Sequence, residues 1–262
     1  MPEGDTLYKA ASRLRPALLG EELTAFGAHR RVGMRPREGE TIDAVAAVGK
    51  WLTIEFSGGL TLTTHLKMTG SWHVAKSGAR WPKPRHLLRA RVGVDGWDGL
   101  CFNAPVVRTF ATSAPLAEKP FGHLGPDLCD AEPDFDACLA SWVRVATDST
   151  TVGEILLDQR VACGVGNVYR AEVLWACGVH PYTPALQVDP ECRFELLQTS
   201  HRLLRANLDT SARVTYRGGL AVYNRQRKGC AGCGGRLNIA QLGEQARTVW
   251  WCPRCQPAAG AA

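Results

Sequence analysis

Cys230-Ala231-Gly232-Cys233 and Cys252-Pro253-Arg254-Cys255 decide how the C-terminal part of this 262-residue chain folds. The two Cys-x2-Cys pairs are separated by 18 residues, which is typical of a site where four thiolates hold one structural Zn²⁺. A ribbon of this length cannot bury enough apolar surface to fold by itself, so a bound metal must stabilise it. Two disulfides are the alternative, and the lack of a secretion signal makes them the less favoured one.

Six further cysteines show no pairing pattern, and their state depends on the cellular compartment. They are Cys101, Cys129, Cys138, Cys163, Cys177 and Cys192. The chain opens with no basic-then-apolar signal stretch and contains no run of about 18 apolar residues, so we expect a cytoplasmic protein without a membrane span. In a reducing cytosol these six thiols should be free and buried.

The net positive charge of the chain is compatible with binding to a polyanion such as nucleic acid. Lys and Arg number 31 and Asp and Glu 25, which gives a net charge of +6 and a pI near 8.9. A solvated basic face would explain so modest an excess, but a protein that binds a phosphate backbone needs one too. Arg247 lies five residues before Cys252, at or near the tip of the expected hairpin. Such an arginine is most often solvated, although in a nucleic-acid-binding protein it can hold a phosphate with two hydrogen bonds.

A glycine-rich break, Gly164-Val165-Gly166-Asn167, interrupts a helical region over residues 135–208. Before it, Thr151-Val152-Gly153-Glu154 is a capping-box pattern that predicts a helix start. After it, helices are predicted over 168–177 and 191–208. Backbone N–H groups at such a break form an anion site, to which Asn167 adds a side-chain donor. An ordinary helical corner with Asn167 as N-cap is the alternative.

Residues 22–112 have the alternating pattern and the turn residues of β-strands. Segments 52–56 and 60–63 alternate, and Ser57-Gly58-Gly59 between them predicts a hairpin. Further strands are predicted over 87–94 and 99–103. Two other segments lack this pattern. Residues 76–85 contain basic residues, prolines and a glycine, which predict a mobile loop. Residues 113–134 are rich in proline, which predicts a linker between domains.

The N-terminal segment predicts a helix beside a reactive amine. Apolar residues recur at helical spacing over 5–19, with Asp5 as the expected N-cap, Gly20 as the stop and Pro16 expected to kink or shorten the last turn. Removal of Met1 would leave Pro2 as an unblocked secondary amine, followed at once by the Glu3 carboxylate. The positive end of the helix dipole should lower the pKa of that amine.

A secondary amine at the chain start can attack a sugar aldehyde carbon and form a Schiff base. With Pro2 this adduct is a fixed iminium cation, which no proton loss can discharge. The alternative is that Pro2 is only a permissive second residue.

Seven motifs, taken together and in this order, resemble the formamidopyrimidine-DNA glycosylase/endonuclease VIII family over essentially the whole chain. They are Pro2-Glu3-Gly4, Gly49-Lys50, His65-Leu66-Lys67-Met68-Thr69-Gly70, Arg108-Thr109-Phe110, Leu124-Gly125-Pro126, Leu157-Asp158-Gln159 through Gly164-Val165-Gly166-Asn167-Val168-Tyr169, and the closing ribbon.

That resemblance implies an α+β multidomain fold. Its parts are an N-terminal helix with a two-layer β-sandwich (residues 1–125), a helix–two-turn–helix DNA-binding domain (126–215) and a C-terminal zinc ribbon (216–262). It also implies a bifunctional base-excision-repair DNA glycosylase and AP lyase, a monomer that binds double-stranded DNA containing oxidised bases or abasic sites. Such an enzyme flips the damaged base out of the duplex, and it is associated with the nucleoid when bound to DNA.

The resemblance implies roles for individual residues. Pro2 matches the family's nucleophile, Glu3 the acid/base that protonates the opening sugar, and Lys50 a lysine that grips phosphate beside the lesion. Asn167 and Arg247 match a phosphate clamp, which Tyr169 assists through its N–H or hydroxyl.

Met68, Arg108 and Phe110 match the residues that fill the gap left by the flipped base, although core packing of Met68 and Phe110 is an alternative. Two departures from the family pattern concern this wedge. Thr109 and Ala111 stand within a motif that more usually reads Arg-Arg-Phe-Gly, and Lys67 stands where the formamidopyrimidine branch usually has glycine.

Three features favour the endonuclease VIII branch, and with it oxidised pyrimidines as substrates. The segment before Cys230 is short where the 8-oxoguanine branch carries a long capping loop, Gly153 stands where that branch commonly has a lysine, and Leu174-Trp175, near the end of the second helix, resembles the endonuclease VIII side. The alternatives are a formamidopyrimidine/8-oxoguanine enzyme, a non-catalytic damaged-DNA-binding zinc protein, and an abasic-site lyase with little glycosylase activity.

Overall fold

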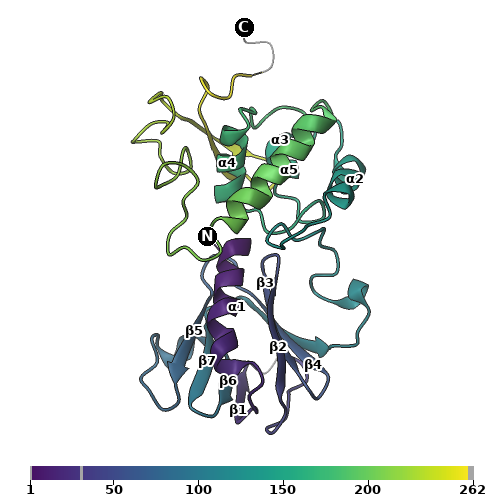
Figure 1. Ribbon diagram of the computed structural model, residues 1–262, viewed down its shortest axis with the longest axis vertical. Coiled ribbons are helices and arrows are strands. Elements are labelled where there is room, and N and C mark those ends of the chain that lie inside the picture. The colour runs from purple at the N-terminus through teal and green to yellow at the C-terminus, as the bar shows by residue number, and fades with distance from the viewer. Residues whose placement is uncertain (1, 30–31, 259–262) are drawn as a thin grey trace. The chain divides into compact units, whose positions relative to one another are not determined.

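The computed structural model describes residues 2–29 and 32–258, which form two compact units that divide between His123 and Leu124 (Figure 1). The division falls inside the proline-rich segment 113–134 that the sequence marks as a linker. The further division of the second unit at residues 215 and 216 stays a prediction. Met1, whose removal the amine chemistry requires, lies outside the described residues.

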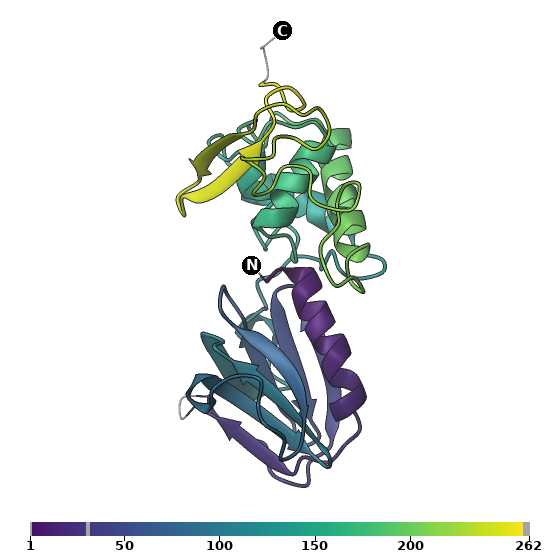
Figure 2. The same cartoon turned by 90° about the vertical axis from the view of Figure 1, so that its left-hand side faces the viewer.

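The first unit consists of one helix and two four-stranded antiparallel sheets, which form the two layers of a sandwich (Figure 2). The helix is α1 (Gly4–Leu18). One sheet has the order β2-β3-β4-β8 and the other the order β1-β6-β7-β5. The strands are β1 (Ala25–Ala28), β2 (Ile42–Val48), β3 (Trp51–Phe56), β4 (Leu60–His65), β5 (Ser71–Lys76), β6 (Leu88–Val94), β7 (Trp97–Phe102) and β8 (Val106–Ala111), with short 3-10 turns at Arg85–Leu87 and Leu116–Glu118.

Alternation along the strands builds a single apolar core between the two sheets. Leu52, Ile54 and Phe56 of β3 are buried on one side of it, and Val92 of β6 on the other. The inner side of α1 adds Leu7, Leu14 and Leu18, all at most 1% exposed. Burying side chains of this size contributes about 1.5–3 kcal/mol each. The predicted hairpin over 52–63 is confirmed, because β3 and β4 pair antiparallel across the Ser57–Gly59 turn.

Two details of α1 differ from the prediction. The N-cap is Glu3 and not Asp5, so the prediction for Asp5 is wrong: its buried carboxylate pairs with Lys9 one turn later, at 3.4 Å. The helix also continues through Pro16 to Leu18. A proline in the last turn removes only one intrahelical donor, and the apolar contact of Leu18 with the core holds the end of the helix. Gly20, at φ +81°, follows as predicted.

The second unit contains four helices and a small hairpin among its described residues. The elements are α2 (Phe135–Val145), α3 (Val152–Ile155), α4 (Asn167–Ala176), α5 (Pro190–Arg205), β9 (Asn238–Leu242) and β10 (Arg247–Trp251). The Thr151 capping box is confirmed, and α3 ends at Ile155, before the glycine-rich break, which precedes α4. Gly166 is the N-cap of α4, so Asn167 is the first helical residue and not the cap.

None of the six cysteines outside the ribbon forms a disulfide within the described residues, but two of the six are not buried, contrary to the prediction. Cys177 and Cys192 are partly exposed, whereas the remaining four are buried. Burial raises the pKa of the Cys138 thiol to about 12. Among the helices of residues 2–29 and 32–258, none combines the length and apolarity that crossing a bilayer requires.

Candidate functional site

The N-terminus of α1 presents a buried carboxylate next to Pro2. Glu3 is 0% exposed, while Pro2 is partly exposed. The backbone N–H of Glu3 donates to Thr6 Oγ1 at 3.3 Å, which fixes the residue at the helix start. A carboxylate shielded from water beside an amine can act in both its protonated and its ionised state. This end of α1 therefore has the residues for an amine nucleophile and a proton donor.

The register of α1 on β2 brings the Lys50 turn to the same end. Arg15 Nε donates to Val45 O at 2.7 Å, and the N–H of Gly20 donates to Ile42 O at 2.9 Å, so α1 runs antiparallel to β2. From Arg15 back to Glu3 the helix rises ~18 Å, and from Val45 to Lys50 the strand advances ~17 Å. The start of α1 and the β2–β3 turn thus lie at one end of the first unit (Figure 1).

His65, which opens one of the seven motifs but has no role predicted from the sequence, lies at this end beside Lys50. Burial, then the charges of Lys67 and Lys50, lower the pKa of His65 from 6.5 to about 4, so its imidazole is neutral near pH 7. Its Nδ1 accepts the Lys67 backbone N–H at 3.0 Å, which leaves the ring proton on Nε2. The Trp51 ring, adjacent to Lys50, packs edge-on against it at 4.9 Å. His65 can therefore donate to an anion that Lys50 attracts.

Met68 lies on the turn between β4 and β5 with its side chain 68% exposed. The turn is closed by the Gly70 N–H, which donates to Leu66 O at 2.8 Å. Lys67 in this turn has φ +46°, a left-handed conformation that favours glycine. This explains why glycine suits the position in the formamidopyrimidine branch. Because the Met68 side chain is exposed, it is not part of the core, and it is free to insert into the gap that a flipped base leaves.

Arg108 and Phe110 lie within β8, not on the turn that carries Met68. Arg108 pairs with Thr63 and is exposed. The Phe110 ring packs edge-on against Phe121 at 5.9 Å, which partly covers it. The three residues predicted to fill a base gap thus come from two different elements, and Met68 is the most exposed of them.

In the second unit, Asn167 contacts Thr248, the residue next to Arg247, although the two lie far apart in the sequence. Asn167 Nδ2 donates to the carbonyl oxygen of Thr248 at 2.9 Å, and Arg170 Nη2 donates to the same oxygen at 2.8 Å. Thr248 directly follows Arg247, which is exposed and begins β10 after the hairpin turn. An amide NH₂ has two donors, so Asn167 can hold Thr248 and still donate to a phosphate.

Tyr169 lies in the first turn of α4 and is fully buried. The Arg213 guanidinium stacks over its ring at 5.3 Å. Burial keeps the hydroxyl from any surface ligand. The backbone N–H in the first turn of α4 is the part of Tyr169 that suits an anion.

The four cysteines of the ribbon converge into one cluster, with all four Sγ atoms within 4.8 Å of one another. The Cys230–Cys255 and Cys233–Cys252 sulfur pairs are 3.8 Å and 3.5 Å apart, too far for disulfides. A tetrahedral ion with Zn–S bonds of ~2.3 Å separates its sulfurs by about 3.8 Å. Trp175 Nε1 donates to Cys230 Sγ at 3.2 Å, as expected of a thiolate with an outer hydrogen bond. The cluster could therefore hold a metal ion.

Two family descriptions match the chain and cover most of it. The formamidopyrimidine-DNA glycosylase N-terminal domain matches residues 1–112, and the formamidopyrimidine-DNA glycosylase H2TH domain matches residues 124–216. Probable endonuclease 8 2 of Streptomyces coelicolor is 37% identical over 98% of this chain and 94% of its own length. Endonuclease 8 2 of Mycobacterium bovis is 35% identical over 98% of this chain and its full length.

Solved structures show the same fold. Lactococcus lactis Fpg in complex with DNA containing an abasic site has a TM-score of 0.81 at 21% identity, and the match covers 97% of this chain and 99% of that one. The same protein in complex with DNA containing an oxidised pyrimidine also has a TM-score of 0.81, over 98% of this chain and 100% of that one. The predicted fold class is thereby confirmed.

Proposed function

The chain belongs to the formamidopyrimidine-DNA glycosylase/endonuclease VIII family, and we propose that it removes oxidised pyrimidines from double-stranded DNA through a Schiff base at Pro2. Membership places the protein among the bifunctional base-excision-repair enzymes, as a DNA glycosylase and AP lyase. Thymine glycol and the 5-hydroxylated forms of cytosine and uracil are the proposed lesions, together with abasic sites.

The reaction uses the residues at the start of α1. The Pro2 amine attacks C1′ of the deoxyribose and displaces the base, while the Glu3 carboxylic acid protonates the sugar as its ring opens. The resulting iminium withdraws electrons from C2′, so loss of a proton there expels the 3′ phosphate. A second elimination expels the 5′ phosphate and leaves a one-nucleoside gap. Lys50, with His65 beside it, holds the phosphate next to the reacting sugar.

The preference for pyrimidines rests on the segment between α5 and Cys230. There, the N–H groups of Thr215 and Tyr216 donate to Gly219 O at 2.8 Å and 3.0 Å, which closes a tight turn. Glu172, itself fully buried, accepts the N–H groups of residues 221–223 at 2.6–2.9 Å and the Thr215 hydroxyl. These hydrogen bonds fix the chain on both sides of the short turn. The segment is therefore too short to form a loop that covers a flipped purine.

Gly153 supports the same preference. It is buried in α3, where a Cβ atom would approach Leu242 Cδ2 to 2.4 Å and Pro181 O to 2.9 Å. The position therefore has no room for the lysine that the purine-acting branch commonly carries. The 8-oxoguanine enzyme remains the second candidate within the family.

Borohydride trapping tests the mechanism and the lesion preference together. Protein whose N-terminus is confirmed as Pro2 by mass is reacted with duplexes that contain thymine glycol, 8-oxoguanine opposite cytosine, or an abasic site. We expect a covalent adduct at Pro2 on thymine glycol and abasic DNA, formed faster than on 8-oxoguanine. Protein with a residual N-terminal tag, whose amine is blocked, should give none.

Each other pattern of trapping contradicts a defined part of the proposal. Faster reaction on 8-oxoguanine would move the protein to the purine-acting branch. Adducts on the abasic duplex alone would make it a lyase with little glycosylase activity. No adduct on any duplex would refute Pro2 as the nucleophile.

Arg247→Ala tests the phosphate clamp that Asn167 and Arg247 are proposed to form. Loss of one phosphate contact should weaken duplex binding several-fold, equally for all sequences, and reduce the slope of log K against log salt by about 0.9. Fluorescence anisotropy at several salt concentrations measures both. Arg254→Ala, which removes an exposed arginine of the same ribbon, should change neither. A change in lesion preference alone would show that Arg247 reads the base and not the backbone.

The remaining assignments complete the proposal. We propose that the ion of the four-cysteine cluster is one structural Zn²⁺, which the all-thiolate donor set favours. The enzyme is proposed to act as a monomer, in the cytoplasm and at the nucleoid.

A further inference from the structure

The segment Lys76–Arg91 carries a charge equal to the positive excess of the whole chain. It holds six Lys and Arg residues and no Asp or Glu: Lys76, Arg80, Lys83, Arg85, Arg89 and Arg91. The chain has 31 basic and 25 acidic residues, so the rest of it has 25 of each and nets zero. A segment with this local charge is a candidate phosphate-binding surface.

The segment folds back over the outer face of the sheet β1-β6-β7-β5. Trp72 of β5 points into the core, so its neighbour Ser71 points outward, and Ser71 pairs with Phe102 of β7. Phe102 is nevertheless 0% exposed, because Trp81 packs edge-on against it with ring centroids 6.3 Å apart. Lys83 Nζ donates to Ser71 Oγ at 2.7 Å. The loop is thus anchored to the sheet by an aromatic contact and a hydrogen bond.

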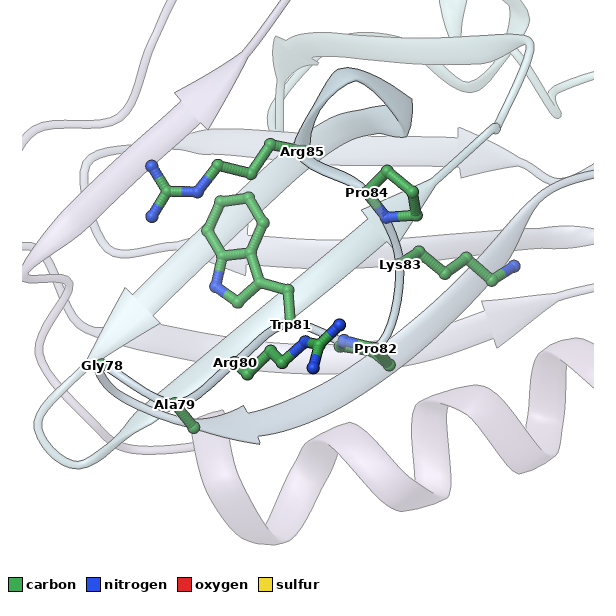
Figure 3. Close-up of a pocket in the computed structure, with 8 residues that line it drawn as sticks. All are labelled: Gly78, Ala79, Arg80, Trp81, Pro82, Lys83, Pro84 and Arg85. Carbon is green, nitrogen blue, oxygen red and sulfur yellow. The ribbon is translucent and has the colours of Figure 1, made fainter.

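A cavity of about 880 Å³ opens on this loop (Figure 3). Its lining is Gly78, Ala79, Arg80, Trp81, Pro82, Lys83, Pro84 and Arg85. The Arg85 guanidinium lies over the Trp81 indole, 4.9 Å from the ring centroid. Figure 3 shows Arg80 and Arg85 extending on either side of that indole. The volume falls within the roughly 300–1,000 Å³ of small-ligand sites, which is room for one nucleotide.

The cations of this cavity have no acidic partners. No carboxylate of residues 2–29 and 32–258 forms an ion pair with Arg80, Lys83 or Arg85, and the nearby Asp98 is paired with Arg91 at 2.8 Å. Arg80 and Arg85 are exposed. A basic loop that only contacts solvent would have the same charge. Such a loop would not require a tryptophan stacked under an arginine, or prolines that restrict the backbone on both sides of Lys83.

We propose that the loop 78–85 binds an unpaired nucleotide of single-stranded DNA. The base stacks on the indole of Trp81, where Arg85 now lies, and Arg80, Lys83 and the displaced Arg85 hold the adjoining phosphates. An indole beside unpaired cations is the combination that binds single strands, since every base has a face to stack. A paired base in a duplex does not expose that face, so an intact duplex does not occupy this site.

The position of this loop links it to the turn that carries Met68. Ser71, which accepts from Lys83, is the first residue of β5 and follows that turn directly. The Thr69 hydroxyl in the turn donates to Asn103 O at 3.0 Å, and the Asn103 N–H donates to Leu87 O, at the end of the loop, at 2.9 Å. Unpaired DNA held by the loop would therefore lie next to the exposed Met68 within the first unit.

Fluorescence anisotropy with a labelled dT12 oligonucleotide tests the proposal on the full-length protein. Trp81→Ala should weaken dT12 binding roughly tenfold, as expected for the loss of one stacked base. Arg80→Gln with Arg85→Gln should weaken it and reduce the salt slope by about 1.4, which corresponds to two phosphates of a single strand. Arg37→Gln, an exposed arginine at the opposite end of the sandwich from the Lys50 turn, should bind dT12 as the wild type does.

Nicking of a blunt abasic duplex by the same variants separates this site from the catalytic one. We expect nicking rates within about twofold of wild type in every loop variant. If Trp81→Ala fails to fold because Phe102 is uncovered, the Arg80/Arg85 double variant, at exposed positions, decides the outcome. Unchanged dT12 affinity in the double variant would overturn the proposal. An equal loss of dT12 binding and duplex nicking would also overturn it, since the loop would then belong to the duplex-binding surface.

Discussion

Glu3→Gln is expected to abolish base excision while abasic DNA is still bound and partly cleaved. The substitution keeps the shape of the buried side chain and the helix start, since the N–H of residue 3 still reaches Thr6. It removes the proton that the opening sugar needs, and loss of a general acid costs roughly 10²–10⁴-fold in rate. An abasic site is already open to attack by Pro2, so its cleavage depends less on that proton. Single-turnover base release from a thymine glycol duplex, with nicking of an abasic duplex in parallel, measures the two effects.

Asp5→Asn provides the matched control for this experiment. Asp5 is a second buried carboxylate in the first turn of α1, paired with Lys9 at 3.4 Å. Its loss changes the charge at the helix start to the same extent but removes no proposed proton donor. We expect a much smaller loss of base release than for Glu3→Gln. Equal losses in the two variants would mean that the charge of the helix start matters and that the acid is another group.

Loss of the metal is expected to unfold the ribbon and to weaken duplex binding strongly. The apolar contacts of the ribbon are few, and metal binding by four thiolates supplies about 10–16 kcal/mol of folding free energy in modules of this kind. Cys252 is 0% exposed, so Cys252→Ser removes one ligand and leaves the other three thiolates without a complete site. Arg247 would then have no fixed hairpin from which to bind phosphate.

Elemental analysis and anisotropy on an undamaged duplex give the readout for this prediction. Wild-type protein should contain one zinc per chain, and the Cys252→Ser protein should contain none and bind duplex at least tenfold more weakly. Cys177→Ser, at a partly exposed cysteine outside the cluster, should retain the zinc and the affinity. A Cys252→Ser protein that keeps the wild-type affinity would show that the ribbon folds without its metal.

Some parts of the site were predictable because their signal is local in the sequence. The four-cysteine cluster follows from ligand type and spacing, and its sulfurs do converge. The β3–β4 hairpin follows from period-2 alternation and a glycine turn. The N-cap of α1 was missed because capping depends on whether a side chain reaches back to the helix start, and Asp5 pairs forward with Lys9 instead. His65 opens one of the seven motifs, but the sequence does not indicate its low pKa, because that pKa depends on burial and on lysines that the turns bring near the ring.

The sequence by itself determined the family, the four-cysteine cluster and the residue types at the start of α1, because each depends on chemistry or spacing within a short stretch. Only the tertiary structure decided how distant residues act on one another. In the folded protein Leu242 packs against Gly153, and Trp81 packs edge-on against Phe102. The Glu172 carboxylate accepts hydrogen bonds from Thr215 and from residues 221–223. These contacts depend on how strands and helices pack across the chain, and packing of that kind leaves no periodic trace in the sequence.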